Sequence, residues 1–236
     1  MLFYDADPIL IAAAVIPAIF LLIQVNRADK LDKEPWGLLL GLVVRGIIAT
    51  SLAVFTEELG EALLEGLWPE DSVVYRVIMY FIVVGLSEEG FKYLVLKRRT
   101  WRSPAFNCQF DGVVYAVSVS LGFALWENIG YVAMYGLGTA MVRALTAVPG
   151  HACFGVIMGA YYGMAKRYEN YGYPKESKTC RRLAVLIPMI VHGIYDYIAS
   201  SDVGGSEWLF LIFVVLLFVI TSRKIKKLSR EDQYID

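Results

Sequence analysis

Ionisable side chains lie inside apolar stretches of this sequence, which is an unusual place for them. Such a group at membrane depth costs at least ~2.5 kcal/mol on insertion scales, and it usually serves a function. The adjacent pair Glu88 and Glu89 is followed at helical spacing by Lys92. The only two histidines of the chain, His151 and His192, also lie within apolar runs. Carboxylates and imidazoles are the groups that hydrolysis and proton transfer require.

Four further polar residues could support the same chemistry. Glu127 stands near the middle of an apolar stretch, and Asn128 follows it directly. Asp196 follows His192 by four residues, about one helical turn, so its carboxylate could orient the imidazole. Arg45 could polarise a substrate carbonyl, although an arginine in an apolar run more often packs or snorkels.

Hydrolysis of a peptide bond by these residues could follow two routes, because it needs an activated water, a base and a group that stabilises the oxyanion. In the first route, Glu127, His151 and His192 bind one zinc ion and leave a position open for water. Glu88 or Glu89 is then the base. In the second route no metal is bound, and a glutamate and a histidine activate water directly. The sequence leaves both routes open and mildly favours the metal.

The elements that must position these residues are membrane-spanning helices. The chain has 236 residues, of which 57% are hydrophobic and 19% charged, whereas soluble domains have about 25% charged residues. A span needs roughly 20 mostly apolar residues, and in lipid each segment must satisfy its own backbone hydrogen bonds, which predicts helices. The acidic stretch 56–71 is expected to form either an interfacial helix or an extension of the second helix. The predicted helices cover approximately 8–25, 37–55, 72–96, 112–135, 143–165, 183–200 and 207–222.

Lysine and arginine fall in alternate connections between these helices. The basic segments are 26–36, 97–111, 166–182 and the tail after 222. Because basic loops stay in the cytoplasm, this pattern predicts about seven spans, an N-terminus outside and a cytoplasmic C-terminus. Arg143, at the edge of an apolar run, is expected to be an interfacial anchor. The charge pattern offers no basic surface for nucleic acid.

The candidate residues should lie at similar depth in the bilayer. A rise of ~1.5 Å per residue puts Glu88 roughly 13 Å and His192 roughly 15 Å from the basic edge. Glu127 lies near the centre of its span, and His151 lies about 18 Å from the same edge. We therefore predict one polar cavity among the helices within about 72–200, open toward the outer leaflet.

Four sequence blocks, in this order, resemble those of PrsW-type intramembrane proteases, which are similar to the wider CAAX-protease and bacteriocin-processing group. The resemblance implies a multi-pass enzyme of the bacterial cell membrane. It also implies that the enzyme makes the first (site-1) cut in a membrane-anchored anti-sigma factor and so regulates a sigma factor in a stress response. The blocks are Ser87–Lys92 with the pattern EExxK, Phe110–Tyr115 continuing to Glu127–Asn128, Arg143–Leu145 followed by His151 and Gly155–Gly159, and His192–Gly193 with Tyr195–Asp196.

These observations together predict an all-α transmembrane bundle in which residues 1–236 form one membrane protease domain. The expected partners are the lipid bilayer and a single-span protein substrate. The main alternative is a proton-coupled transporter or channel, in which the same carboxylates and histidines relay protons. A third possibility is an inactive scaffold that binds partners.

Overall fold

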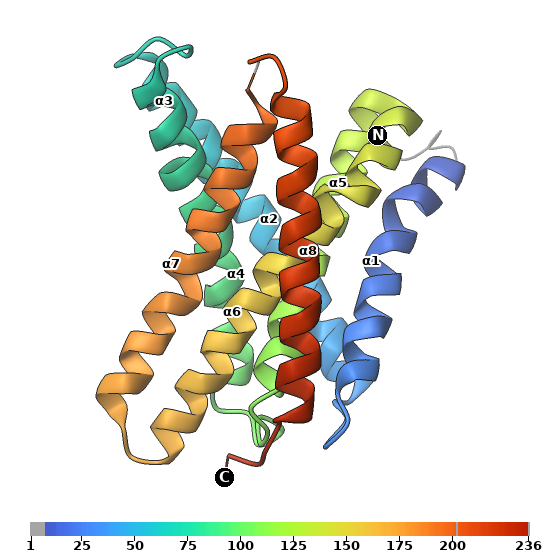
Figure 1. The fold of residues 1–236 in the computed structure, drawn as a ribbon, viewed down its shortest axis with the longest axis vertical. Coiled ribbons are helices and arrows are strands. Elements are labelled where there is room, and N and C mark those ends of the chain that lie inside the picture. Colours follow the sequence, from blue (N-terminus) through green and yellow to red (C-terminus); the bar gives the residue numbers. More distant parts are fainter. Residues whose placement is uncertain (1–7, 202, 236) are drawn as a thin grey trace.

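The computed structural model describes residues 8–201 and 203–235 and is helical nearly throughout (Figure 1). Outside the helices, the described residues contain turns and one isolated bridge between Cys108 and Tyr234. The predicted all-α fold is therefore confirmed. The elements are α1 (Pro8–Ala28), α2 (Trp36–Glu65), α3 (Val73–Val77), the π-helical segment η1 (Ile78–Leu86), α4 (Ser87–Thr100), α5 (Asp111–Leu145), α6 (Ala147–Asn170), α7 (Pro174–Ala199) and α8 (Ser206–Arg230).

The helices follow the order of the seven predicted stretches. In the described part of the chain, five segments are long and apolar enough to cross a membrane. One of them, Asp111–Asn170, contains both α5 and α6, whereas the predicted span 72–96 is divided among α3, η1 and α4. The number of spans and the side that each end faces stay predictions. The five segments are Ile11–Ala28, Trp36–Glu65, Asp111–Asn170, Pro174–Ala199 and Ser206–Arg230.

The basic connections and the C-terminal tail meet at one end of the bundle, at the bottom of Figure 1. The Ile235 backbone N–H donates to the Asn107 carbonyl at 2.8 Å, and the Asn107 side chain donates to Asp32 at 2.9 Å. Arg167 donates to the Gln109 side chain at 3.2 Å. These bonds link the segments around 32, 107, 167 and 235, as alternating connections require. We call this the basic end and the opposite one the acidic end.

The acidic stretch after residue 55 continues the second helix. Of the two expected forms, the extension is the observed one, because α2 runs without interruption from Trp36 to Glu65. The extension carries Glu57, Glu58 and Glu61 along the acidic end of the bundle.

Helix α5 forms the centre of the fold, and glycines let its neighbours approach closely. A Cβ on Gly122 would lie 2.1 Å from the Val43 carbonyl oxygen of α2. A Cβ on Gly112 would lie 2.6 Å from the Gly163 nitrogen of α6. Small residues allow such crossings between membrane helices. The first half of α5 is buried continuously from Asp111 to Ala124, so α5 holds the adjoining helices in fixed positions.

Two irregular segments set the direction of the polar side chains. The π-helical segment η1 ends at Leu86, two residues before Glu88. Such π-helical turns are rare overall but frequent at functional sites. In α5, Gly136 has φ 79°, outside the helical region, and breaks the helix in two. The second part can therefore fold back toward the first, which a straight helix would not allow.

Candidate active site

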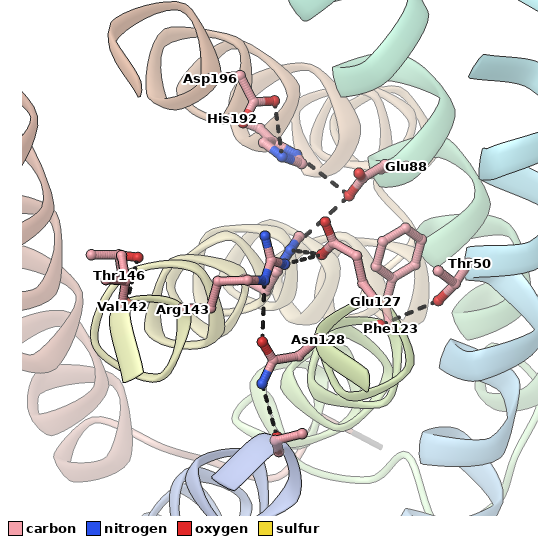
Figure 2. A network of polar contacts seen from close by, with 12 residues as sticks. Thr50, Glu88, Phe123, Glu127, Asn128, Val142, Arg143, Thr146, His192 and Asp196 are labelled. Atoms are coloured by element: carbon pink, nitrogen blue, oxygen red, sulfur yellow. Dashed lines mark hydrogen bonds and ion pairs between the residues drawn. The ribbon is translucent and has the colours of Figure 1, made fainter. Parts of the chain in front are cut away.

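Side chains from α4, α6 and α7 converge on the Glu88 carboxylate. Glu88 Oε2 lies 3.8 Å from His192 Nδ1 and 4.0 Å from His151 Nδ1. All three side chains are buried. Figure 2 shows Glu88 pointing toward His192, with Asp196 behind the imidazole. Acids and imidazoles from separate helices therefore meet in one place, as the sequence led us to expect.

Lys92 lies at the centre of this group and is fully buried. Its Nζ donates to Glu89 Oε1 at 2.7 Å, to Glu88 Oε2 at 3.0 Å and to His151 Nδ1 at 3.1 Å. It also lies 4.0 Å from the centre of the Phe123 ring. A buried charge is tolerated when it is paired and hydrogen-bonded, and Lys92 neutralises one of the two adjacent carboxylates.

The tautomer of His151 follows from its neighbours. An ammonium group can only donate, so His151 Nδ1 must accept from Lys92. The proton of the neutral ring then lies on Nε2, which donates to Glu127 Oε2 at 2.8 Å. Glu127 thus holds the ring with Nδ1 on the side of Lys92, 3.1 Å away, and of Glu88, 4.0 Å away. This is how a carboxylate usually orients a metal-binding histidine.

His192 stands between two carboxylates. Its Nδ1 lies 3.1 Å from Glu89 Oε1, and its Nε2 lies 3.3 Å from Asp196 Oδ2. A neutral imidazole has one N–H, so it can donate to only one of these oxygens. The other contact needs an additional proton or a cation between nitrogen and oxygen. The ring stacks on Phe154 with centroids 4.6 Å apart, which fixes its plane; nothing in the sequence identified Phe154.

Arg143 closes the other side of the group. Its guanidinium lies 3.0 Å from Glu127 Oε2, and its Nε donates to Asn128 Oδ1 at 3.1 Å (Figure 2). Sixteen residues of straight helix would span about 24 Å, so this contact depends on the break at Gly136. Asn128 also donates to the Ala14 carbonyl of α1 at 3.0 Å. Arg143, expected only as an interfacial anchor, thus positions a carboxylate of the site.

A cavity of about 470 Å³ reaches these residues from the acidic end. Glu88, Glu127 and His192 line its inner part, and Glu61 and Ser200 lie among its outer residues. A polar cavity among the helices is therefore present, but helix α2, outside the predicted range 72–200, also lines it. Its residues are Val54, Glu57, Glu58, Glu61, Met79, Tyr80, Val84, Glu88, Glu127, Tyr131, Arg143, Ala147, His151, Phe154, His192, Tyr195, Asp196, Ala199 and Ser200.

Comparison with known proteins matches residues 34–221 to the model of the PrsW family intramembrane metalloproteases. The chain belongs to this family. It is 34% identical to protease PrsW of Oceanobacillus iheyensis over 220 residues, covering 92% of this chain and 95% of the relative. It is 33% identical to protease PrsW of Bacillus subtilis over 220 residues, covering 92% and 94%. With protease PrsW of Clostridioides difficile it shares 30% over 222 residues, covering 91% and 89%. No solved structure matches the chain.

Membership of the PrsW family identifies this chain as a membrane-embedded hydrolase that cleaves peptide bonds. It is a multi-pass protein of the cell membrane, in agreement with its long apolar helices. The prediction of an intramembrane protease is confirmed, and the transporter and scaffold alternatives are set aside.

The structure suggests a metal-binding group that differs in one residue from the group expected from the sequence. Among the described residues, Glu88, His151 and His192 offer ligand atoms that all lie within 4.8 Å of one another. The sequence had pointed to Glu127 in place of Glu88. Glu127 instead contacts His151 from behind, at Nε2, and pairs with Arg143.

Arg45 and Glu57, both on α2, lie differently from what the sequence predicted. Arg45, expected to polarise a carbonyl, donates to the Gly41 carbonyl of its own helix at 3.0 Å. It lies twelve residues from Glu57 along α2, about 18 Å, and so away from the cavity. Glu57 lines the cavity, and its Oε1 is buried without a hydrogen-bond partner among the described residues. The sequence does not single out Glu57, because this residue belongs to a row of glutamates.

The site carries more negative than positive groups. Four carboxylates, Glu88, Glu89, Glu127 and Asp196, stand against the cations of Lys92 and Arg143. With both histidines neutral, the net charge is two negative. One divalent cation would balance it, and so would two added protons, one on His192 and one on a carboxylate. These two cases correspond to the two routes that the sequence left open.

Proposed function

We propose that Glu88, His151 and His192 hold one zinc ion and that the chain makes the first (site-1) cut in a membrane-anchored anti-sigma factor. In this proposal, residues 1–236 act as one protease domain whose catalytic helices lie within 72–200. The observation that carries it is the convergence of Glu88, His151 and His192 at the inner end of a cavity of about 470 Å³.

The three ligand atoms fit a divalent metal in kind and in spacing. Two histidines and one glutamate are the protein ligands of several catalytic zinc sites, and the ligand atoms of tetrahedral zinc lie about 3.3 Å apart. The distances from Glu88 Oε2 to the two Nδ1 atoms are 3.8 and 4.0 Å, and the three ligand atoms all lie within 4.8 Å of one another. Metal binding would need small side-chain movements, and Lys92 would have to release His151 Nδ1. When bound, zinc lowers the pKa of a coordinated water and polarises the scissile carbonyl.

The residues around the ligands have separate tasks. Glu127 and Asp196 accept from the outer nitrogens of the two imidazoles and hold Nδ1 of each ring toward Glu88. Lys92 binds Glu89 and keeps it from repelling Glu88. Phe154 fixes the plane of His192.

Glu127 is the best-placed base. Its side chain is 20% exposed and lines the cavity beside His151, so it can take the proton of the attacking water and deliver it to the leaving amine. Arg143, which binds Glu127 and lines the same cavity, supplies a cation for the oxyanion. Glu88 and Glu127 thus exchange the roles first expected of them.

The metal-free route keeps a specific observation in its favour. Both nitrogens of His192 face carboxylates, which a doubly protonated imidazole would also satisfy. In that case Glu88 activates water and His192 donates a proton to the leaving group. Sensitivity of cleavage to chelators separates the two routes.

The substrate proposal rests on the resemblance of the four sequence blocks and on the site's position between membrane helices. A single-span protein can enter the bundle laterally and present its extracytoplasmic flank to the acidic end of the cavity, where Glu57, Glu58 and Glu61 lie.

The test is co-expression with tagged single-span substrates, followed by immunoblotting of the fragments. An anti-sigma factor should be cut by the wild type and by Glu176→Gln, an exposed control, but not by Glu88→Gln or His192→Ala at equal expression. Cleavage by both site variants would contradict the catalytic roles. Cleavage of an unrelated single-span protein at the same rate would contradict only the anti-sigma assignment.

A further inference from the structure

A second cavity, broadly open to the surface, lies at the basic end of the bundle between α4 and α7, and it has no part in the proposed reaction. Its volume is about 680 Å³. It is separate from the active-site cavity, since the two share no lining residue. The lining residues are Tyr93, Lys97, Lys178, Arg181, Arg182, Val185 and Leu186.

The cavity exists because α7 contacts η1 in the middle of the bundle, whereas α7 and α4 separate toward the basic end. A Cβ on Gly85 of η1 would lie 3.0 Å from the Met189 carbonyl oxygen of α7. A Cβ on Gly193 of α7 would lie 2.6 Å from the Phe81 ring. Below this contact α7 turns away toward its hairpin with α6 (Figure 1), and the space between α4 and α7 opens.

The charges around this space are all of one sign. Four of its seven lining residues are lysine or arginine, and none is acidic. Among the described residues, only Arg181 of these four has an acidic partner, Glu169, at 4.0 Å; it also lies over the Trp101 ring at 5.2 Å. Lys97, Lys178 and Arg182 therefore keep their charges available. Cations that line one space repel one another, and an anion bound between them relieves that repulsion.

The remaining walls suit an acyl chain. Val185 and Leu186 form an apolar side of the cavity, and Leu186 is 44% exposed on the outer surface of α7. The Tyr93 hydroxyl is buried and lacks a hydrogen-bond partner in the described part of the chain. Arg182 directly precedes the apolar run of α7, and Lys97 ends that of α4, so the cations stand where lipid headgroups meet the hydrocarbon.

We propose that this cavity binds one anionic phospholipid. Its phosphate pairs with Lys97, Lys178 and Arg182, and an acyl chain lies along Val185 and Leu186. Basic pockets between membrane helices at the cytoplasmic side are a known form of anionic-lipid site. A soluble anion would leave the apolar wall uncovered, which favours a lipid over free phosphate or a nucleotide.

The bound lipid also braces the active site. Helix α4 carries Glu88 and Glu89 and α7 carries His192, so the lipid joins the two helices whose spacing sets the Glu88–His192 distance. Lys97 lies nine residues from Glu88, about 13 Å. The lipid is too far to take part in the reaction and acts on the position of the helices.

The experiment titrates purified full-length protein in neutral detergent with phosphatidylglycerol or phosphatidylcholine and counts bound lipids by native mass spectrometry. The test variant is Lys97→Gln/Lys178→Gln/Arg182→Gln. The matched control, Arg223→Gln/Lys224→Gln/Arg230→Gln, removes three exposed charges from the tail of α8 outside the cavity. We expect one tightly bound phosphatidylglycerol in the wild type and control, and at least about tenfold weaker binding in the test variant.

Equal binding of both lipids by the wild type would overturn the proposal, as would undiminished phosphatidylglycerol binding by the test variant. Displacement of the lipid by millimolar inorganic phosphate would show an anion site without lipid preference and would also overturn it. If the triple variant fails to fold, Arg182→Gln alone, at an exposed position, should weaken binding on the order of fivefold.

Discussion

Replacement of Lys92 by methionine removes the cation at the centre of the site. Its ammonium group is fully buried and lies 2.7 and 3.0 Å from two carboxylates. At an effective dielectric constant of about 20, each pair contributes about 5–6 kcal/mol before desolvation of the lysine is subtracted. Loss of one partner from a buried ion pair typically costs about 3–5 kcal/mol. We expect a loss of that size in Lys92→Met, which corresponds to a melting temperature lower by roughly 6–20 °C.

Thermal unfolding with a thiol-reactive dye suits this measurement, because Cys108, Cys153 and Cys180 are free and buried in the folded chain. The double variant Glu89→Gln/Lys92→Met supplies the control. It removes both partners of the shorter pair, so it should recover part of the lost stability. A melting temperature of Lys92→Met equal to that of the wild type would refute the reasoning. So would a double variant less stable than the sum of the two single changes.

Two further predictions concern the frame around the site. Gly122→Ala should lower the unfolding free energy by about 1–3 kcal/mol, because its Cβ would lie 2.1 Å from a backbone oxygen of α2; Gly130→Ala, with nothing within 4 Å, should be neutral or stabilising, and the reverse order would contradict the crossing. At the basic end, burial raises the pKa of Glu34 to about 7 and that of Asp29 to about 6, above the ordinary values of about 4. The folded chain thus binds more protons, and this part of its stability falls as pH rises from about 4 to 7. Glu34→Gln should flatten the dependence of melting temperature on pH between 5.5 and 8, and an unchanged slope would contradict burial of a protonated carboxyl.

Candidate site residues could be proposed from the sequence because lipid restricts the backbone to helices. Once Glu88, His151 and His192 are on helices, a rise of ~1.5 Å per residue gives their depth. Polar residues at the same depth in a small bundle tend to face its interior together. In the structure, the ligand atoms of these three residues lie within 4.8 Å of one another.

Depth gives no information about rotation around the helix axis, and the rotation of these side chains could not be predicted from the sequence. The assignment of Glu127 or Glu88 as the third ligand depends on which way each side chain turns. The π-helical turns of η1 change the direction of the Glu88 side chain. The apolar sequence of η1 contains no pattern that predicts π-helical turns. From the sequence, Arg143 could be located only at the edge of a predicted span. Its contact with Glu127 depends on the break of α5 at Gly136, and a single glycine in the sequence does not predict such a break.

The most direct test of the proposed site is the metal content of purified protein, measured by inductively coupled plasma mass spectrometry together with cleavage of a single-span substrate. Glu88→Gln and Glu57→Gln change two carboxylates that line the same cavity. If Glu88, His151 and His192 hold the metal, the wild type and Glu57→Gln should carry about one zinc per chain, and Glu88→Gln should lose both zinc and on the order of 100-fold or more in cleavage rate. Full activity in metal-free wild-type protein, or zinc and activity retained in Glu88→Gln, would contradict this site.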